Sequence, residues 1–502
     1  MSSVQVGLFT IPVGLKGSRV LCWTSSCKLH VFALLPLGDR KDSTLKTVDS
    51  AGIMATIEAR ASEYDAIAKD IWEHPELSHE EERSSAIYRK RLASRGFAVT
   101  EYPEMPYSFV AERGAGDPLI AIMGEYDALP SMSQACSPHQ EALHAGGPGH
   151  ACGHNLLGAG SLAAAEVLAE ALAQGGIPGR VRFYGCPAEE SLGRIPLVKA
   201  GRFDDVDIAL TWHPADVNTP HRYTSSANLS IVFSFTGRAS HAAMAPQAGR
   251  SALDAVQLFN LSLEFMREHL ARGTLLHYVI SDGGAKPNIV PANAATWLYI
   301  RAPRATDLRE VVKRVMKAAR GATLMTETSV DHRILAGKCD YIPNDVIQDT
   351  MLKVMEVLPL PHPDSDELAF ARALQATVAR NDRQATLTPI NAPVSLLDEP
   401  IHGQLGDFGR LCRIGGSLDT GDVSYVVPTG QLNSATWPLG VGAHSWQSAA
   451  ASGSTWAFKA MRWAAASMAA TGLAFALDPK LVARARREHA KGKKPYRSTM
   501  DL

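Results

Sequence analysis

Three short apolar runs, each followed by polar residues, constrain the fold of this chain more than any other feature. They span Pro118–Met123, Val181–Cys186 and Val206–Trp212, and apolar runs of this length are typical of strands buried on both faces. Between the first two runs lies Asn155–Gln174, which is rich in Ala and Leu and ends before two glycines and a proline. This segment reads as a helix with a terminator. Strand, helix and strand form a βαβ unit, which predicts an α/β fold with a largely parallel sheet.

Candidate metal ligands follow these expected strands, where parallel α/β sheets bind their ligands. They are Glu125 and Asp127 after the first strand, Cys152 and His154 at the start of the helix, Glu189 and Glu190 after the second strand, and His213 after the third. Each one alone has an ordinary reading, such as a buried cysteine or a solvated glutamate. Thiolate, imidazole and carboxylate together suit a borderline-soft divalent ion. Four such clusters at successive strand ends therefore predict a metal site.

Two local features indicate what that site does. The glycine between Cys152 and His154 lets the backbone bend so that both side chains face one ion. Glu189 and Glu190 leave a strand in opposite directions, so one can bind the ion while the other transfers a proton. A divalent ion lowers the pKa of water and polarises a carbonyl, while a carboxylate accepts the water proton and delivers it to a leaving amine. The pattern predicts hydrolysis of an amide or similar C–N bond.

Composition excludes several other classes of protein. The 502 residues contain 50 Lys and Arg against 51 Asp and Glu, a net charge of -1, so no global field attracts nucleic acid or an anionic membrane. We expect a small-molecule substrate instead. Seven cysteines are too few for a disulfide scaffold, and their odd number argues against complete pairing. We therefore expect a reducing compartment, the cytoplasm.

The N-terminal residues 1–53 read unlike the rest of the chain. The apolar stretch Val20–Gly38 is interrupted by Lys28 and His30, so it is too short for a membrane helix. A secretory signal is an alternative reading, although the small-residue cleavage pattern is unconvincing. From Met54 onward an amphipathic helical pattern begins. We expect residues 1–53 to be a non-core extension and the folded protein to begin near Met54.

A second pattern interrupts the first between residues 224 and 338. Apolar residues recur at every second position over Leu229–Phe235, which predicts a strand. A helix is expected over Ala252–Leu270, and strands are expected near 275–281 and 295–301. We predict a smaller α/β lid at 224–338, inserted into a catalytic domain formed by 54–223 and 339–478. The segment 479–502 is basic but lacks interleaved aromatic residues, which favours a solvated helix and frayed tail over a nucleic-acid site.

Nine motifs carry a resemblance that spans residues 57–475. They are GEYDALP at 124–130, GHACGHNLLGAG at 149–160, GCPAEE at 185–190, WHPA at 212–215, GRASHAAMAPQAGRSALDAV at 237–256, GGAKPNIVP at 283–291, YIRAP at 299–303, GSLDTGDVSYVVPT at 416–429 and GAHSWQ at 442–447. The chain resembles the metal-dependent aminoacylase and carboxypeptidase superfamily. Within it, the motifs are similar to the amidohydrolase branch that includes the B subunit of aminobenzoyl-glutamate hydrolase.

The resemblance implies roles for individual residues. The implied ligands of one or two divalent ions, Mn²⁺ or Zn²⁺ in relatives, are Cys152, His154, Glu190, His213 and His444. Glu189 would be the general base, and Asp127 would orient a ligand. The lid would form homodimers in which His241 reaches the partner's active site and stabilises an oxyanion. Asn288 and Arg301 would contact the substrate, Arg301 through a carboxylate.

The chain also departs from this pattern at two positions. Asn155 stands where many relatives of the branch carry Asp, and it instead follows the aminobenzoyl-glutamate type. Glu190 is followed by SLGR instead of a glycine-rich run, so the loop beside the metal should have a different shape. Asp419 and Asp422 could be metal ligands by residue type, but the stretch that holds them is also typical of an ordinary turn, and we expect them to form the loop.

The expected function is hydrolysis of an amide between an acyl or aroyl group and an amino acid or a similar carboxylate-bearing amine. One alternative is hydrolytic deamination of an amino-substituted aromatic acid by the same site. Another is a weakly catalytic, metal-binding subunit of a hetero-oligomer with a paralogous subunit. The intact ligand set and Glu189 argue against this last alternative.

Overall fold

The larger sheet of the protein has seven strands in the order β1-β2-β4-β3-β5-β11-β6. The computed structural model describes residues 48–492 and 495–502, so the alternative of a secretory signal at Val20–Gly38 falls outside it. The four central strands, β4, β3, β5 and β11, run parallel, and the other three pair antiparallel. The strands are β1 Ala98–Glu101, β2 Phe109–Ala115, β3 Leu119–Glu125, β4 Gly179–Cys186, β5 Ile208–Ala215, β6 Thr219–Pro220 and β11 Thr429–Ala435. The predicted mixed, largely parallel α/β sheet is confirmed, and the three apolar runs form β3, β4 and β5.

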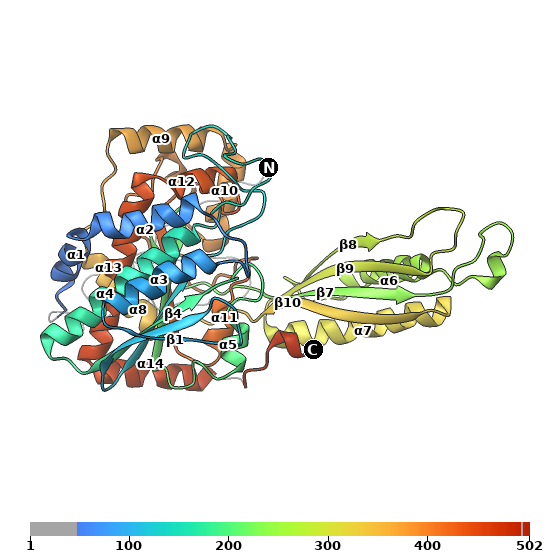
Figure 1. Cartoon of the computed structure of the whole chain (residues 1–502), viewed down its shortest axis with the longest axis horizontal. Coiled ribbons are helices and arrows are strands. Elements are labelled where there is room, and N and C mark those ends of the chain that lie inside the picture. Colours follow the sequence, from blue (N-terminus) through green and yellow to red (C-terminus); the bar gives the residue numbers. More distant parts are fainter. Residues whose placement is uncertain (1–47, 493–494) are drawn as a thin grey trace, which may run out of the picture. The chain divides into compact units, whose positions relative to one another are not determined.

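Two long alanine-rich helices pack together against this sheet, α4 (His154–Gly175) and α13 (Thr455–Leu477) (Figure 1). Small side chains allow the close approach, and most residues of both helices are buried. Among the described residues, only α4 has the length and apolar composition of a membrane span, and 83% of that stretch is buried within the protein. It is thus a core helix. The other helices around the sheet are α1 Ser50–Glu58, α2 Ala61–Glu73, α3 Glu82–Ser94, α5 Ile195–Lys199, α8 Asp345–Val357, α9 Ser365–Ala376, α10 Arg380–Leu387, α11 Thr420–Ser424, α12 Trp446–Ala451 and α14 Pro479–Gly492.

The helix expected from Met54 differs from the prediction. It begins at Ser50, and the chain turns at Arg60 so that α1 and α2 are separate helices. The turn lets Ile57 and Tyr64 both enter the main core, and the Arg60 guanidinium binds Glu170 on α4, 2.7 Å away. Ile53, which precedes the expected start, is also buried in this core.

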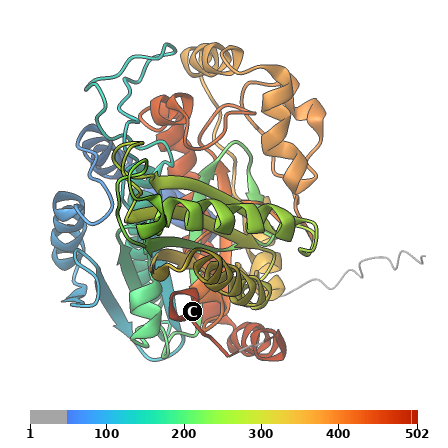
Figure 2. The ribbon, with the colours of Figure 1, turned by 90° about the vertical axis from the view of Figure 1, so that its right-hand side faces the viewer.

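The smaller sheet has four antiparallel strands in the order β10-β7-β9-β8. They are β7 Ala227–Thr236, β8 Leu275–Asp282, β9 Asn293–Ala302 and β10 Ser329–Lys338, and the helices α6 Ala252–Arg267 and α7 Ala305–Thr326 lie side by side along it (Figure 2). The alternation expected over 229–235 is present, since Leu229, Ile231, Phe233 and Phe235 are buried against the two helices.

The chain enters and leaves the smaller sheet at one end. Lys338, the last residue of β10, pairs with Asn228 near the start of β7. At that end, Ser226 N–H donates to Gly416 O at 2.9 Å, which ties the sheet to the loop before α11. The ten residues of β7 carry its other end ~30 Å further along the strand. Loops that follow Thr236 therefore lie at the far end of this sheet.

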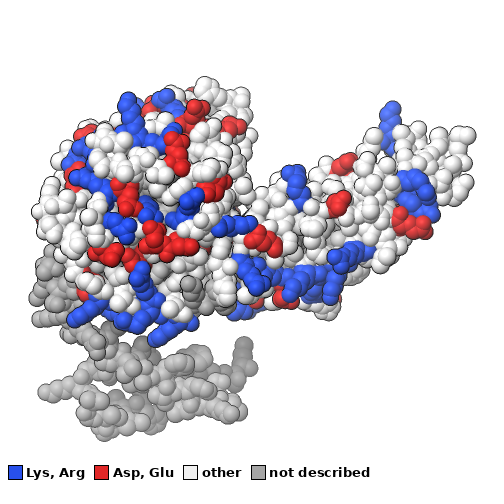
Figure 3. All heavy atoms as spheres, turned by 60° about the horizontal axis from the view of Figure 1, so that its bottom comes forward, with Lys and Arg blue, Asp and Glu red and all other residues white. Residues whose placement is uncertain are grey.

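Basic residues gather on α7 and at the C-terminus. Figure 3 shows Lys and Arg side chains in a row along α7, where Arg309, Lys313, Lys317 and Arg320 line a shallow groove. Helix α14 buries Leu481, Val482 and Ala485 and turns its basic residues outward, as a solvated helix would. The end of the chain is not the frayed tail that was expected. Thr499 is buried, and the Tyr496 hydroxyl donates to Asp422 Oδ1 at 2.9 Å.

Candidate metal centre

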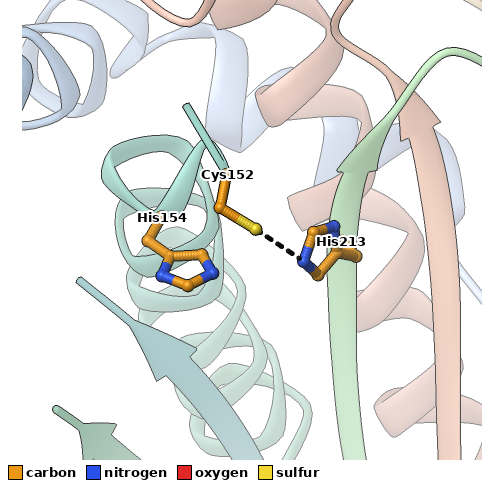
Figure 4. A group of neighbouring side chains, drawn as sticks. All are labelled: Cys152, His154 and His213. Atoms are coloured by element: carbon orange, nitrogen blue, oxygen red, sulfur yellow. Dashed lines mark hydrogen bonds between the residues drawn. The ribbon is translucent and has the colours of Figure 1, made fainter. Parts of the chain in front are cut away.

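Five side chains meet in two groups that share one sulfur atom. Cys152, His154 and His213 form the first group, and Cys152, Glu190 and His444 form the second. Within each group the candidate ligand atoms all lie within 4.8 Å of one another. Figure 4 shows the first group, in which Cys152 Sγ lies 3.6 Å from His213 Nε2. The structure thus brings together the five residues that the family resemblance implies as metal ligands.

The local backbone explains how these residues converge. His213 lies on β5, near its end. Cys152 lies in the loop before α4, and His154 is the first residue of that helix. Gly153 between them has a φ of 74°, in the left-handed region, and a Cβ there would lie 2.9 Å from the ring of Pro214. Only glycine makes this turn without strain. The glycine therefore allows Cys152 and His154 to face the same space.

Asp127 contacts two of the candidate ligands at once. Its Oδ1 lies 2.8 Å from His154 Nδ1, and its Oδ2 accepts from the Glu190 N–H at 2.9 Å. Burial opposes ionisation, but His154 and the hydrogen bonds from Glu190 and Ser78 outweigh it and lower the pKa of Asp127. Asp127 thus holds His154 by Nδ1 and leaves Nε2 available for an ion.

His444 joins the centre from a strained turn. Its φ is 61°, unusual for a residue with a side chain, and its N–H donates to Ala151 O at 2.9 Å. His444 Nε2 lies 3.2 Å from Glu190 Oε1. His154 Nε2 likewise lies 3.2 Å from Glu125 Oε2. Each contact pairs a carboxylate with an imidazole that is grouped with the Cys152 thiol, and this donor set fits a divalent ion.

Charge interactions within the centre favour the metal-binding form of the cysteine. Burial disfavours a thiolate, but His154 and His213 outweigh it and lower the pKa of Cys152. Against the opposing effect of burial, Cys152 raises the pKa of His213 to about 9. Hydrogen bonds to Cys152 and Glu190 raise the pKa of His444 to about 11. Binding of a cation in place of these protons would release them.

Glu189 points to different partners from those of Glu190. Its Oε1 accepts from Lys338 Nζ at 2.7 Å and from the Asp419 N–H at 3.2 Å. One of its carboxylate oxygens also lies within 4.8 Å of ligand atoms of Glu125 and His154. Glu189 is therefore beside the metal ligands, while Glu190 is among them, which fits the division of roles inferred from their adjacency in the sequence.

Three charged residues of this region were not assigned a role at the site from the sequence. Arg194 is fully buried and forms ion pairs with Asp419 and Glu125. The SLGR sequence that stands in place of a glycine-rich run therefore provides a buried cation close to the metal ligands. Asp419 is buried just before α11, where it accepts from Arg194 Nε at 2.8 Å, and is more than a turn residue. Lys338 is the last residue of the segment predicted as a lid, 224–338, and no spacing pattern in the sequence singles it out. Only an unusual charge after an apolar or alternating run could have drawn attention to these positions.

The remaining predicted residues lie on the smaller sheet. His241 pairs with Ile289 in an isolated bridge, and Ala242 N–H donates to Asn288 O at 3.0 Å. Both loops lie beyond the far end of β7, and no described contact joins them to the metal ligands of the same chain. Arg301 lies at the near end, where its Nη1 donates to Gly415 O at 3.2 Å and Ser417 Oγ at 3.1 Å. Arg301 thus borders the loop that leads to Asp419.

Comparisons with known proteins agree with this geometry. The family model of the peptidase dimerisation domain matches residues 223–324. The B subunit of p-aminobenzoyl-glutamate hydrolase from Escherichia coli (strain K12) is 40% identical over 447 residues, which cover 86% of this chain and 93% of that protein. Xaa-Arg dipeptidase of Mus musculus is 32% identical over 308 residues, which cover 58% of this chain and 67% of that protein.

A crystal structure shares the fold at low identity. It is a dinuclear metal-binding peptidase from Bacillus subtilis, with a TM-score of 0.55 at 16% identity, covering 83% of this chain and 98% of that one. Because the sequence match with the Escherichia coli protein spans nearly the whole of both chains, the chain belongs to the M20 family of metal-dependent peptidases and amidohydrolases, in the branch that includes the B subunit of p-aminobenzoyl-glutamate hydrolase.

Proposed function

We propose that this amidohydrolase cleaves the amide C–N bond of an N-acyl or N-aroyl amino acid, such as an aminobenzoyl-glutamate-like compound or a small dipeptide. The observation that supports it best is the pair of ligand groups that share Cys152, with Glu189 beside them. The names of three relatives describe cleavage of amide bonds. They are one subunit of a p-aminobenzoyl-glutamate hydrolase, a dipeptidase and an N-acetylcysteine deacetylase.

Two divalent ions, Mn²⁺ or Zn²⁺, suit this donor set. His154 and His213 would hold one ion, Glu190 and His444 the other, and Cys152 would bind both. When bound, the ions lower the pKa of a water molecule and polarise the substrate carbonyl. Asp127 orients His154 for this role through the 2.8 Å contact with Nδ1.

The chain's own residues then handle the proton and the substrate. Glu189 accepts the proton of the attacking water on its carboxylate and delivers it to the nitrogen of the leaving amine. His241 of the partner subunit donates a hydrogen bond to the oxyanion. Asn288 and Arg301 bind the substrate, with the planar guanidinium of Arg301 suited to both oxygens of a carboxylate.

The partner in this scheme is a second copy of the chain, joined through residues 224–338. The location of His241 at the far end of the smaller sheet supports this assignment, because within its own chain the described contacts of His241 are local. Residues 54–223 and 339–478 form the catalytic domain in this division. A hetero-oligomer with a paralogous subunit is the alternative assembly, since the Escherichia coli relative is named as one subunit of its enzyme. Five free cysteines among the described residues fit a cytoplasmic location.

A panel of substrates tests the proposal. Purified protein loaded with Mn²⁺ is incubated with aroyl-amino acids, dipeptides and amino-substituted aromatic acids, and each turnover is compared with that of Glu189→Gln. We expect cleavage of an amide substrate by the wild type and strong loss in the variant. Release of ammonia from the aromatic acids alone would favour deamination instead. Equal turnover by both proteins on every substrate would contradict the mechanism.

A further inference from the structure

The buried amine of Lys338 is the nearest cation to Glu189 that the proposed mechanism leaves without a role. Lys338 is 7% exposed, and its Nζ donates to both the backbone oxygen of Glu189, at 2.5 Å, and the side-chain Oε1, at 2.7 Å. Burying a lysine is costly unless its charge is compensated. Although burial opposes it, Glu189, Asp419 and Glu190 raise the pKa of Lys338, so the amine is charged.

We propose that Lys338 is a positioning residue that fixes the carboxylate of the general base, Glu189, through a two-point contact. The inference rests on the proposed role of Glu189. A side chain held at its own backbone oxygen and at Oε1 by one ammonium group cannot rotate freely. The Asp419 N–H donates to the same Oε1 at 3.2 Å. With Oε1 occupied by two donors, the other carboxylate oxygen is the one left for the proton of the attacking water.

The backbone around Lys338 makes this contact rigid. The Lys338 N–H donates to Asn228 Oδ1 at 2.9 Å, and the following Cys339 N–H donates to Asp422 Oδ2 at 2.9 Å. Asn228 lies on β7, where the chain enters the smaller sheet, and Lys338 ends β10, where it leaves. Both connections to the smaller sheet therefore meet at Lys338, whose backbone N–H is held by Asn228 and whose amine holds Glu189. The orientation of the base depends on a residue that the inserted segment supplies.

A separation of kcat from KM tests this role. For Lys338→Met at matched metal content, we expect kcat to fall ~10–100-fold, as when a group that orients a catalytic residue is removed, while KM changes little. Lys338→Arg should recover most of the loss because it restores a cation. If Lys338→Met does not fold, Lys338→Gln, which retains a donor without the charge, is compared in the same way. An unchanged kcat in the folded variant would overturn the proposal.

A double variant that combines Lys338→Met with Glu189→Gln identifies the residue through which Lys338 acts. In Glu189→Gln, adding Lys338→Met should reduce the residual turnover no further, whereas independent effects would multiply. In the metal-free protein, the decreases in melting temperature of the two single variants should likewise fail to add. Additive effects in both measurements would overturn the proposal.

Arg462→Met provides the matched control. Arg462 is a similarly buried cation, 8% exposed, and it pairs with Glu58 and Asp65 far from Glu189 in the sequence. Arg462→Met should lower the melting temperature of the protein and leave kcat unchanged. If Glu189→Gln retains full activity, the proposed function fails. If Glu189→Gln is inactive and Lys338→Met is fully active, only the role of Lys338 fails.

Discussion

The smaller sheet and the metal centre are ordered by different forces. In the smaller sheet, Leu229, Ile231 and Phe233 alternate along one strand and enter one apolar core with α6 and α7. At the metal centre, buried charges from strand ends and loops are held by one another, as when Asp127 contacts both His154 and the Glu190 N–H. Apolar burial therefore stabilises the smaller sheet, while charge compensation sets the chemistry of the metal centre. Substitutions should therefore affect stability in one and activity in the other.

The largest effect is expected for Glu189→Gln. Loss of the proton-accepting carboxylate should lower kcat by ~10²–10⁴-fold, the usual contribution of general acid–base catalysis, while the metal content of the protein stays constant. Steady-state kinetics and elemental analysis measure the two quantities. Glu264→Gln, which removes an exposed carboxylate that pairs with Arg267 on α6, serves as the control. Wild-type kcat in Glu189→Gln would remove the functional difference between the two regions.

His241→Ala should lower kcat by ~10²–10³-fold, as loss of an oxyanion donor does. Because we place His241 in the partner's active site, a mixture of His241→Ala and Glu189→Gln chains should recover activity after subunit exchange. In such a mixed dimer, one site has an intact Glu189 and receives an intact His241. No recovery in verified mixed dimers would mean that His241 acts within its own chain or not at all.

The sequence predicted these two regions unequally. Alternation located β7, and apolar runs located β3, β4 and β5, because burial on one or two faces leaves a pattern in the sequence. Ligand types at strand ends identified Cys152, His154 and His213. His444 entered only through the family resemblance, Lys338 was missed, and Asp419 was assigned to a turn. A buried ion pair formed between distant segments has no local periodicity, so neither partner can be identified before the fold is known.

Phe233→Ala tests the apolar side of the comparison. Phe233 is buried between β7 and α6, with its ring centroid 4.8 Å from that of Phe259, so truncation should cost about 3–5 kcal/mol in the free energy of unfolding. The remaining folded protein should keep its kcat per bound metal. Urea unfolding and kinetics on the same preparation separate these results. A loss of kcat without a loss of stability would reverse the assignment.

A smaller effect is expected at His221, a buried imidazole whose ring hydrogen-bonds to the uncharged side chains of Asn433 and Gln431. Burial lowers its pKa to about 3, so the unfolded chain binds this proton more readily than the folded one. The linked stability is therefore lost as pH falls from about 6.5 towards 3. In metal-free protein, His221→Gln should lose less stability than wild type between pH 6.5 and pH 4 in urea unfolding. The exposed His332→Gln should behave as wild type, and equal acid sensitivity of all three would contradict this assignment.

The number of metal ions bound per chain shows whether one sulfur, that of Cys152, serves two ions. Elemental analysis of protein dialysed against Mn²⁺ or Zn²⁺ should find two ions in the wild type, about one in His444→Ala, and a loss of both in Cys152→Ala. If Cys152→Ala binds as many ions as the wild type, the two groups do not share their sulfur and the account of the centre is wrong.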